Sequence, residues 1–169
     1  NDPSMPEVYR EVYSSWGLPK DEFVETGHWP NQLYVREARR MIADYVVTEA
    51  DCYGRQRPND SVGMGSYTLD SHNCTRFVWT DPSTGKAQVR NEGDVQVPPT
   101  DPYPISYRAI VPKRGQCENL FTPTCISASH IAYGSARMEP VFMGLAESGA
   151  LAVDIAMKEK NIALQDVPY

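Results

Sequence analysis

The stretch PVFMGLAESGALAVDIAMKEK, residues 140–160, predicts one long helix. Pro140 suits the first turn, where a helix does not need an N–H group from that residue. Small and apolar residues recur at helical spacing and form one face: Phe142, Leu145, Ala146, Gly149, Ala152, Val153 and Ala156. Glu147, Asp154 and Lys158 leave only a narrow polar stripe, so we expect a largely buried helix.

Gly149 is unexpected on this face, because glycine in a helix interior costs roughly 1 kcal/mol relative to alanine. Its presence indicates that a neighbouring backbone approaches the helix closely at this point. The alternative is an exposed glycine without a packing role, whose replacement would stabilise the helix.

The segment directly before this helix, residues 127–140, reads SASHIAYGSARMEP. A helix N-terminus has free N–H groups and the positive end of the helix dipole, which favour a bound anion. Gly134 lets the backbone approach a ligand, and Arg137 adds a fixed positive charge. From residue types alone, the segment is either a ligand-binding turn or a plain loop before a plain helix.

Short strand-like runs occupy the middle of the chain, at residues 65–69, 76–80, 87–91, 105–111 and 119–127. Residues 81–86, DPSTGK, have the composition of a hairpin loop. Pro123 weakens the last run, because proline cannot donate to a strand ladder. The pattern predicts an α+β fold: a mainly antiparallel sheet with flanking helices and a long buried C-terminal helix.

Two further segments precede these strands. Residues 4–16 predict a helix with a capping box at Ser4 and Glu7. Its apolar stripe, expected to pack in the core, is Met5, Val8, Tyr9, Val12, Tyr13 and Trp16. Residues 33–47 contain strand formers interrupted by REARR at 36–40, and Thr48 with Asp51 can cap a short helix.

Charge and cysteine content exclude several classes of function. The 16 basic and 22 acidic residues give a net charge of −6, which argues against a nucleic-acid partner. No apolar run approaches the roughly 18 residues of a membrane helix, so we expect no membrane partner. Four cysteines without a CxxC pair and only three histidines predict no metal site, and any disulfide pairing stays open. Without a recognisable signal peptide, a cytoplasmic, periplasmic or secreted location stays open as well.

Residues 127–137, followed by Gly144, Ala146 and Gly149, resemble the C-terminal flavin-contacting motif of a bacterial FAD-dependent oxidoreductase family. Members of this family are related to the glutathione-reductase-like flavoproteins, and many bear the name xanthan lyase. Residues 33–48, 65–72 and 107–112 also resemble family segments and occur in the expected order. One departure is LFTPT at 120–124, which stands where many relatives have a glycine-containing strand end.

The resemblance implies FAD as cofactor and hydride transfer from a small organic or carbohydrate substrate. The residues implied to border the isoalloxazine ring are His130, Gly134, Ser135, Arg137 and Glu139. Those implied to border the substrate, as catalytic candidates, are Arg36, Glu37 and His72. The implied parts are an N-terminal helix and connection at 1–30, a β-rich substrate part at 31–118, and a strand and helix at 119–169 that return to the FAD-binding domain.

The family's dinucleotide site has no counterpart in this sequence. That site is a strand, a G-x-G-x-x-G turn and a helix that hold the pyrophosphate, whereas Gly63-Met64-Gly65 lacks the third glycine. We therefore expect the chain, which begins at Asn1, to be the tail of a longer flavoprotein. Alone it should be inactive, bind no FAD, and associate with a second copy through an uncovered C-terminal helix.

Other interpretations stay open on the residues alone. The chain can be a non-enzymatic carbohydrate- or protein-binding domain, or a polysaccharide lyase with a base beside a uronate carboxylate. The arginine-rich run suits anionic substrates through bidentate contacts, and it equally suits a structural ion-pair network. His72 can act as a general acid or base, or Asp70-Ser71-His72 can form a simple turn.

Overall fold

The computed structural model describes residues 2–32 and 39–168, which belong to two compact units, Asn1–Glu37 and Ala38–Tyr169. The first unit contains helix α1 (Glu7–Ser14) and the short 3₁₀ helix η1 (Val24–Thr26). No residue of α1 is buried, so the expectation that its apolar stripe packs in a core is wrong. The predicted capping box is wrong too, because Pro6 is the N-cap and the Ser4 hydroxyl donates to Asp2.

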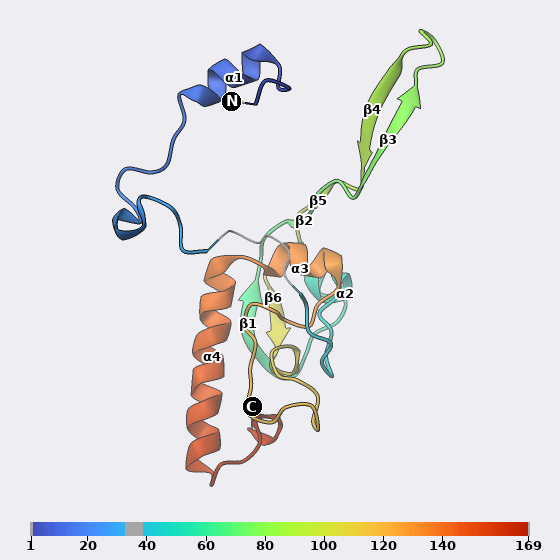
Figure 1. Cartoon of the computed structure of the whole chain (residues 1–169). Coiled ribbons are helices and arrows are strands. Elements are labelled where there is room, and N and C mark those ends of the chain that lie inside the picture. Colours follow the sequence, from blue (N-terminus) through green and yellow to red (C-terminus); the bar gives the residue numbers. More distant parts are fainter. Residues whose placement is uncertain (1, 33–38, 169) are drawn as a thin grey trace. The chain divides into compact units, whose positions relative to one another are not determined.

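The second unit has an α+β fold, as predicted. Its elements in chain order are α2 (Glu49–Cys52), β1 (Ser61–Gly65), β2 (Leu69–Ser71), β3 (Thr75–Thr80), β4 (Ala87–Glu92), β5 (Val95–Val97), β6 (Tyr103–Ser106), η2 (Tyr107–Ala109), α3 (His130–Ala136), α4 (Glu139–Lys158) and η3 (Leu164–Asp166). The strands form three antiparallel pairs, β1 with β6, β2 with β5 and β3 with β4 (Figure 1). The division expected at residues 118 and 119 stays a prediction.

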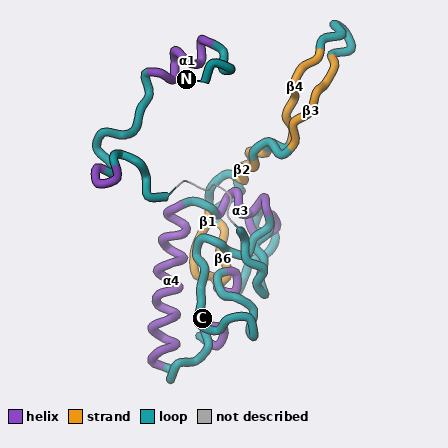
Figure 2. Tube along the Cα trace, viewed as in Figure 1, coloured by secondary structure: helices purple, strands orange, loops and turns teal. Residues whose placement is uncertain are grey.

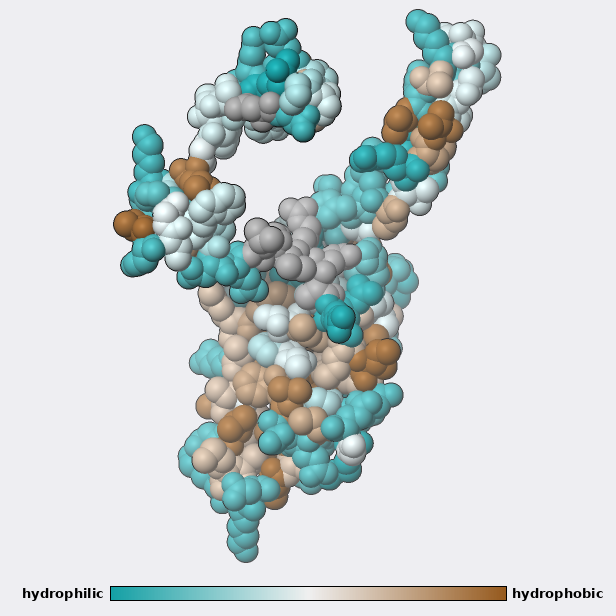
Figure 3. Space-filling view, viewed as in Figure 1, coloured by the Kyte–Doolittle hydropathy of each residue, from teal (hydrophilic) through white to brown (hydrophobic). Residues whose placement is uncertain are grey.

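Strands β2 to β5 form two stretches of one antiparallel ribbon (Figure 2). Ser71 pairs with Val95 and Thr75 pairs with Glu92, so one strand has an extra residue at the junction, as in a β-bulge. The predicted hairpin is confirmed at β3 and β4. Its outer residues include exposed Val78 and Val89, and apolar residues are visible on the surface of the ribbon (Figure 3).

Two predicted strands are replaced by other structure. The run expected at 105–111 ends as a strand at Ser106, and the chain continues as η2. Residues 119–127 form no strand, and the extended chain there is held by single hydrogen bonds such as Thr122 N to Ile110 O (2.7 Å). The strand expected at 33–47 is reduced, over its described residues 39–47, to one parallel bridge between Val47 and Ala128. Residues 33–38 lie outside the described residues.

The long helix is confirmed as α4, and the predicted face is the one that packs. Leu145, Gly149, Ala152 and Ala156 are buried, and the helix lies against β1 and η3. The opposite side was expected to be buried too, and this is wrong, because Met143, Leu151 and Met157 are exposed. Among the described helices, α4 is long and apolar enough to cross a membrane by length and composition, with 22% of its apolar window buried. The expectation that no apolar run approaches the length of a membrane helix is therefore wrong, although length and composition do not distinguish a membrane span from a core helix.

The close approach predicted at Gly149 is present, but the neighbour is a side chain. A Cβ atom at Gly149 would lie within 3.0 Å of three ring atoms of Phe121. Phe121 is partly buried and packs against the core. The packing of the Phe121 ring against Gly149 therefore connects the segment before α3 to the middle of α4.

Two glycines of α4 provide a matched test of this packing. Gly149→Leu should destabilise the chain by about 1–3 kcal/mol, because the side chain overpacks the contact with Phe121. Gly144→Leu should stabilise it by up to about 0.8 kcal/mol through helix propensity, since a Cβ there meets no atom within 4 Å. Urea denaturation of the three proteins measures both effects. Equal shifts of the same sign for the two variants would contradict the packing role of Gly149.

Candidate functional site

Six of the eight candidate residues lie where β2 meets α3 and α3 leads into α4. These residues are His72, His130, Gly134, Ser135, Arg137 and Glu139. We call residues 70–72 and 130–139 the α3–β2 corner (Figure 1). The other two candidates, Arg36 and Glu37, lie outside the described residues, and their roles stay predictions.

Gly134 allows α3 to lie directly against β2. A Cβ atom on Gly134 would be closer than 3.0 Å to the backbone carbonyl oxygen of Asp70, so no larger residue fits without a shift of the strand. The close approach read from the sequence is thus real, but in this structure it is an approach to the chain's own backbone.

Arg137 follows α3 and is only 5% exposed. Its Nη2 donates to Asp70 Oδ2 at 2.5 Å, and Asp70 is itself largely buried. A buried charge needs such a partner, because desolvation alone costs several kcal/mol per ion. The positive charge expected at Arg137 is therefore present but is compensated by a carboxylate from β2.

His72 lies directly after β2, with its side chain 52% exposed. Its Nε2 atom is 3.8 Å from the Oδ2 atom of Asp70 that also accepts from Arg137. An accessible imidazole beside a carboxylate can exchange protons with a bound molecule. The geometry thus permits, for His72, the acid–base role that the sequence left open.

His130 is the first residue of α3 and contacts Ser71 of β2. The distance between His130 Nε2 and Ser71 Oγ is 3.0 Å, as expected for a nucleophile and its base. However, His130 Nδ1 faces Arg40 Nη1 at 3.5 Å, and a guanidinium group can only donate. In the tautomer in which Nδ1 accepts from Arg40, Nε2 carries the proton and donates to Ser71, and His130 is then not poised to deprotonate that serine.

Ser135 is fully buried and links α3 to two other segments. It accepts a hydrogen bond from Tyr103 Oη (2.8 Å) and donates to the carbonyl oxygen of Tyr67 (2.5 Å). Burial raises the pKa of the Tyr103 phenol above its usual range, so the hydroxyl stays protonated and can donate. In this structure Ser135 therefore holds α3 in place through its hydrogen bonds to Tyr103 and Tyr67.

The start of α4 is the accessible part of the corner. Met138 is the N-cap residue and no side chain caps the first turn, in which Glu139 and Pro140 are exposed. Pro140 has no N–H group and Phe142 N donates to Met138 O (3.1 Å), so the N–H groups of Glu139 and Val141 are those that lack a partner within the helix at its positive dipole end. This turn can therefore stabilise negative charge on a bound group, in addition to that of Glu139.

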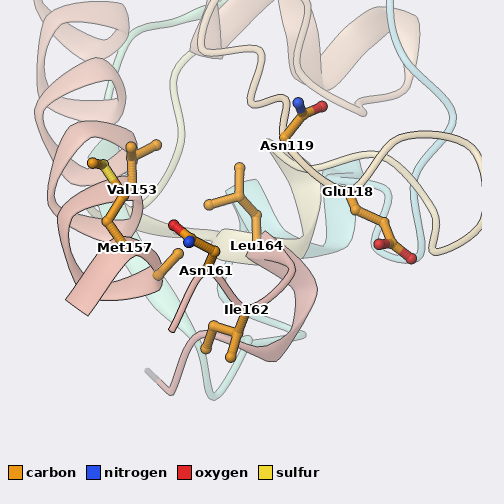
Figure 4. Close-up of a pocket in the computed structure, with 8 residues that line it drawn as sticks. Glu118, Asn119, Val153, Met157, Asn161, Ile162 and Leu164 are labelled. Atoms are coloured by element: carbon orange, nitrogen blue, oxygen red, sulfur yellow. The ribbon is translucent and has the colours of Figure 1, made fainter. Parts of the chain in front are cut away.

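A separate pocket lies at the other end of α4 (Figure 4). It has a volume of about 170 Å³, and its lining includes Glu118, Val153, Met157 and Leu164. The candidate residues of the α3–β2 corner are not among those that line it. The pocket and the predicted site are thus at opposite ends of the same helix.

The cysteines, whose pairing the sequence left open, are all free thiols. Cys52 is the last residue of α2 and is buried, and burial raises the pKa of its thiol to about 11. Such a thiol stays protonated near neutral pH and behaves as a small apolar residue.

The structure defines an α+β domain with a polar corner at the start of its longest helix. Within the described residues, no group of three or more His, Cys, Asp or Glu side chains is placed to hold a metal ion.

The chain belongs to the FAD dependent oxidoreductase family, whose model matches residues 4–169. No curated protein and no solved structure matches it. Membership confirms the FAD-dependent oxidoreductase resemblance at the level of the family.

Sequence reasoning missed the partners that assemble this corner. Asp70 was read only as part of a turn, whereas it contacts Arg137 through its side chain and Gly134 through its backbone. Ser71 was likewise not singled out, although it contacts His130. The signal that pointed to them was the grouping of three polar residues, Asp70-Ser71-His72, at the end of a strand-like run.

The Asp70–Arg137 pair should be strongly coupled. Asp70→Asn or Arg137→Met alone should destabilise the chain by about 3–5 kcal/mol. Each variant removes one charge of the pair and leaves the other charge buried without a partner. The double variant should cost clearly less than the sum of the two. Lys158→Met breaks the exposed pair with Asp154 and should cost at most about 0.5 kcal/mol. Urea denaturation measures all four variants, and additive losses at Asp70 and Arg137 would exclude the coupling.

Proposed function

We propose that this chain is the C-terminal, substrate- and flavin-contacting part of an FAD-dependent oxidoreductase. The observation that supports the proposal most directly is the uncapped first turn of α4 beside the α3–β2 corner, in a chain that belongs to this family. The finer resemblance, to a family that is related to the glutathione-reductase-like flavoproteins and whose members often bear the name xanthan lyase, is part of the same proposal. FAD, when bound, accepts a hydride from the substrate.

The residues fit the isoalloxazine end of FAD and not its ADP end. A reduced flavin carries negative charge, and the first turn of α4 offers N–H groups and a dipole that stabilise such charge. The sequence has no G-x-G-x-x-G turn for the pyrophosphate. We propose that residues outside this chain bind the ADP end.

The candidate residues then divide by accessibility. Glu139 is exposed and His130 is half-buried, and both would contact the flavin directly. Gly134, Ser135 and Arg137 are buried and would contribute by holding α3 and the start of α4 in place. In this arrangement Arg137 and Asp70 together add little net charge, so the helix dipole supplies most of the stabilisation.

His72 would lie on the substrate side and, as a general base, accept the proton that the substrate loses when its hydride passes to FAD. Arg39 and Arg40 are exposed, and Arg40 lies close enough to His130 to bring positive charge to the corner. The resemblance implies a substrate-side role for Arg36 and Glu37 too, which lie outside the described residues. Guanidinium groups bind carboxylates and other anions in a bidentate manner, so we propose a substrate with an anionic group.

A visible absorption spectrum tests the division of the cofactor between two parts. The purified chain should carry far less than one flavin per polypeptide, because residues for the ADP end are lacking. The longer protein that includes a dinucleotide-binding domain, purified in the same way, should show the flavin bands. A near-stoichiometric flavin spectrum from residues 1–169 alone would contradict the division, and a colourless longer protein would contradict the proposed function.

A further inference from the structure

The imidazole of His130 is held at both nitrogen atoms. Nε2 lies 3.0 Å from Ser71 Oγ, and Nδ1 lies 3.5 Å from Arg40 Nη1. We propose that Ser71 is a positioning residue that fixes the orientation of the His130 ring at the corner. The functional consequence rests on the proposed contact between His130 and the flavin.

The backbone positions of Ser71 and His130 are fixed by the elements to which they belong. Ser71 is the last residue of β2 and is 5% exposed, and His130 is the first residue of α3. Gly134 packs against the backbone of Asp70, which adjoins Ser71, so α3 cannot slide along the strand. The ring of His130 therefore reaches the hydroxyl of Ser71 from a fixed position, and only side-chain rotation remains.

The Ser71 hydroxyl opposes rotation of the His130 ring. A half-turn about the Cβ–Cγ bond exchanges the positions of nitrogen and carbon atoms on each side of an imidazole. For His130, it would place a C–H group against Ser71 Oγ and another against Arg40, so both polar contacts would be lost. Ser71 Oγ can accept from Nε2 while it donates to the carbonyl oxygen of His72 at 3.4 Å. The hydroxyl thus links the two histidines of the corner.

The contact has a spectroscopic signature that needs no flavin. A hydrogen-bonded Nε2–H proton exchanges slowly with water, whereas that of a solvated imidazole exchanges too fast to be observed. In a ¹H–¹⁵N spectrum of the isotope-labelled chain near neutral pH, His130 should show a protected Nε2–H signal. His130→Gln assigns the signal, which should disappear in that variant.

Three serine variants test the positioning role. Ser71→Ala should abolish the protected signal and leave the backbone amide spectrum otherwise native. Ser71→Thr keeps the hydroxyl and should retain the signal. Ser66→Ala, at an exposed serine five positions earlier in the chain, should also retain it. Absence of the signal in the parent chain, or its persistence in Ser71→Ala, would overturn the proposal, and the parent spectrum decides even where a variant fails to fold.

The longer flavoprotein separates this inference from the proposed function. There, Ser71→Ala should lower kcat at least tenfold relative to Ser66→Ala, with Ser71→Thr restoring most of it. Unchanged kcat in both Ser71→Ala and His130→Gln, with the spectroscopic signal behaving as expected, would overturn the flavin-side role of His130. The structural positioning by Ser71 would then stand alone.

Discussion

The rest of this structure depends on the close packing of α3 on β2 at Asp70. The Asp70 backbone lies where a side chain on Gly134 would be, and the Asp70 carboxylate pairs with buried Arg137. The two contacts act on the C-terminal half of α3 and on Arg137, the residue that follows it. Because an unpaired buried charge is costly, the pair also fixes the orientation of the chain as it leaves α3 for α4. One residue of β2 thereby sets the direction in which the first turn of the longest helix points.

Local patterns in the sequence predicted the elements whose stability is local. The spacing of Leu145, Gly149 and Ala152 predicted the buried face of α4, and the Thr48–Asp51 capping box is present at the start of α2. The hairpin of β3 and β4 followed from its turn composition. Such elements need only neighbouring residues, so a single sequence contains their signal.

The same patterns did not predict contacts between residues that are far apart in the sequence. The strand expected at 119–127 fails because its backbone donors and acceptors meet distant single partners, such as Ile110 and Val47, rather than a continuous neighbour. The apolar stripe of α1 predicted burial, yet none of its residues is buried. In the candidate site, the resemblance identified His130 and Arg137, but their partners Ser71 and Asp70 lie far away in the sequence and only the folded chain identifies them.

The division of roles at the corner follows from these contacts. Residues that face inward are paired with one another, as Arg137 is with Asp70 and Ser135 is with Tyr103. Groups that remain accessible, namely the first turn of α4, Glu139 and the half-exposed His72, are the ones available to a ligand. A rigid buried layer beneath an accessible polar surface is the arrangement that pre-organised binding requires.

Hydrogen–deuterium exchange of the proposed longer flavoprotein tests most directly whether the flavin lies at this corner. Amide exchange is compared between the protein with FAD and the same protein after the flavin has been removed. We predict that FAD slows exchange at the amides of Glu139, Val141 and Phe142 in the first turn of α4, and leaves the amides of residues 157–162, at and just after the C-terminal end of α4, unchanged. Unchanged exchange at those three first-turn amides would contradict this prediction.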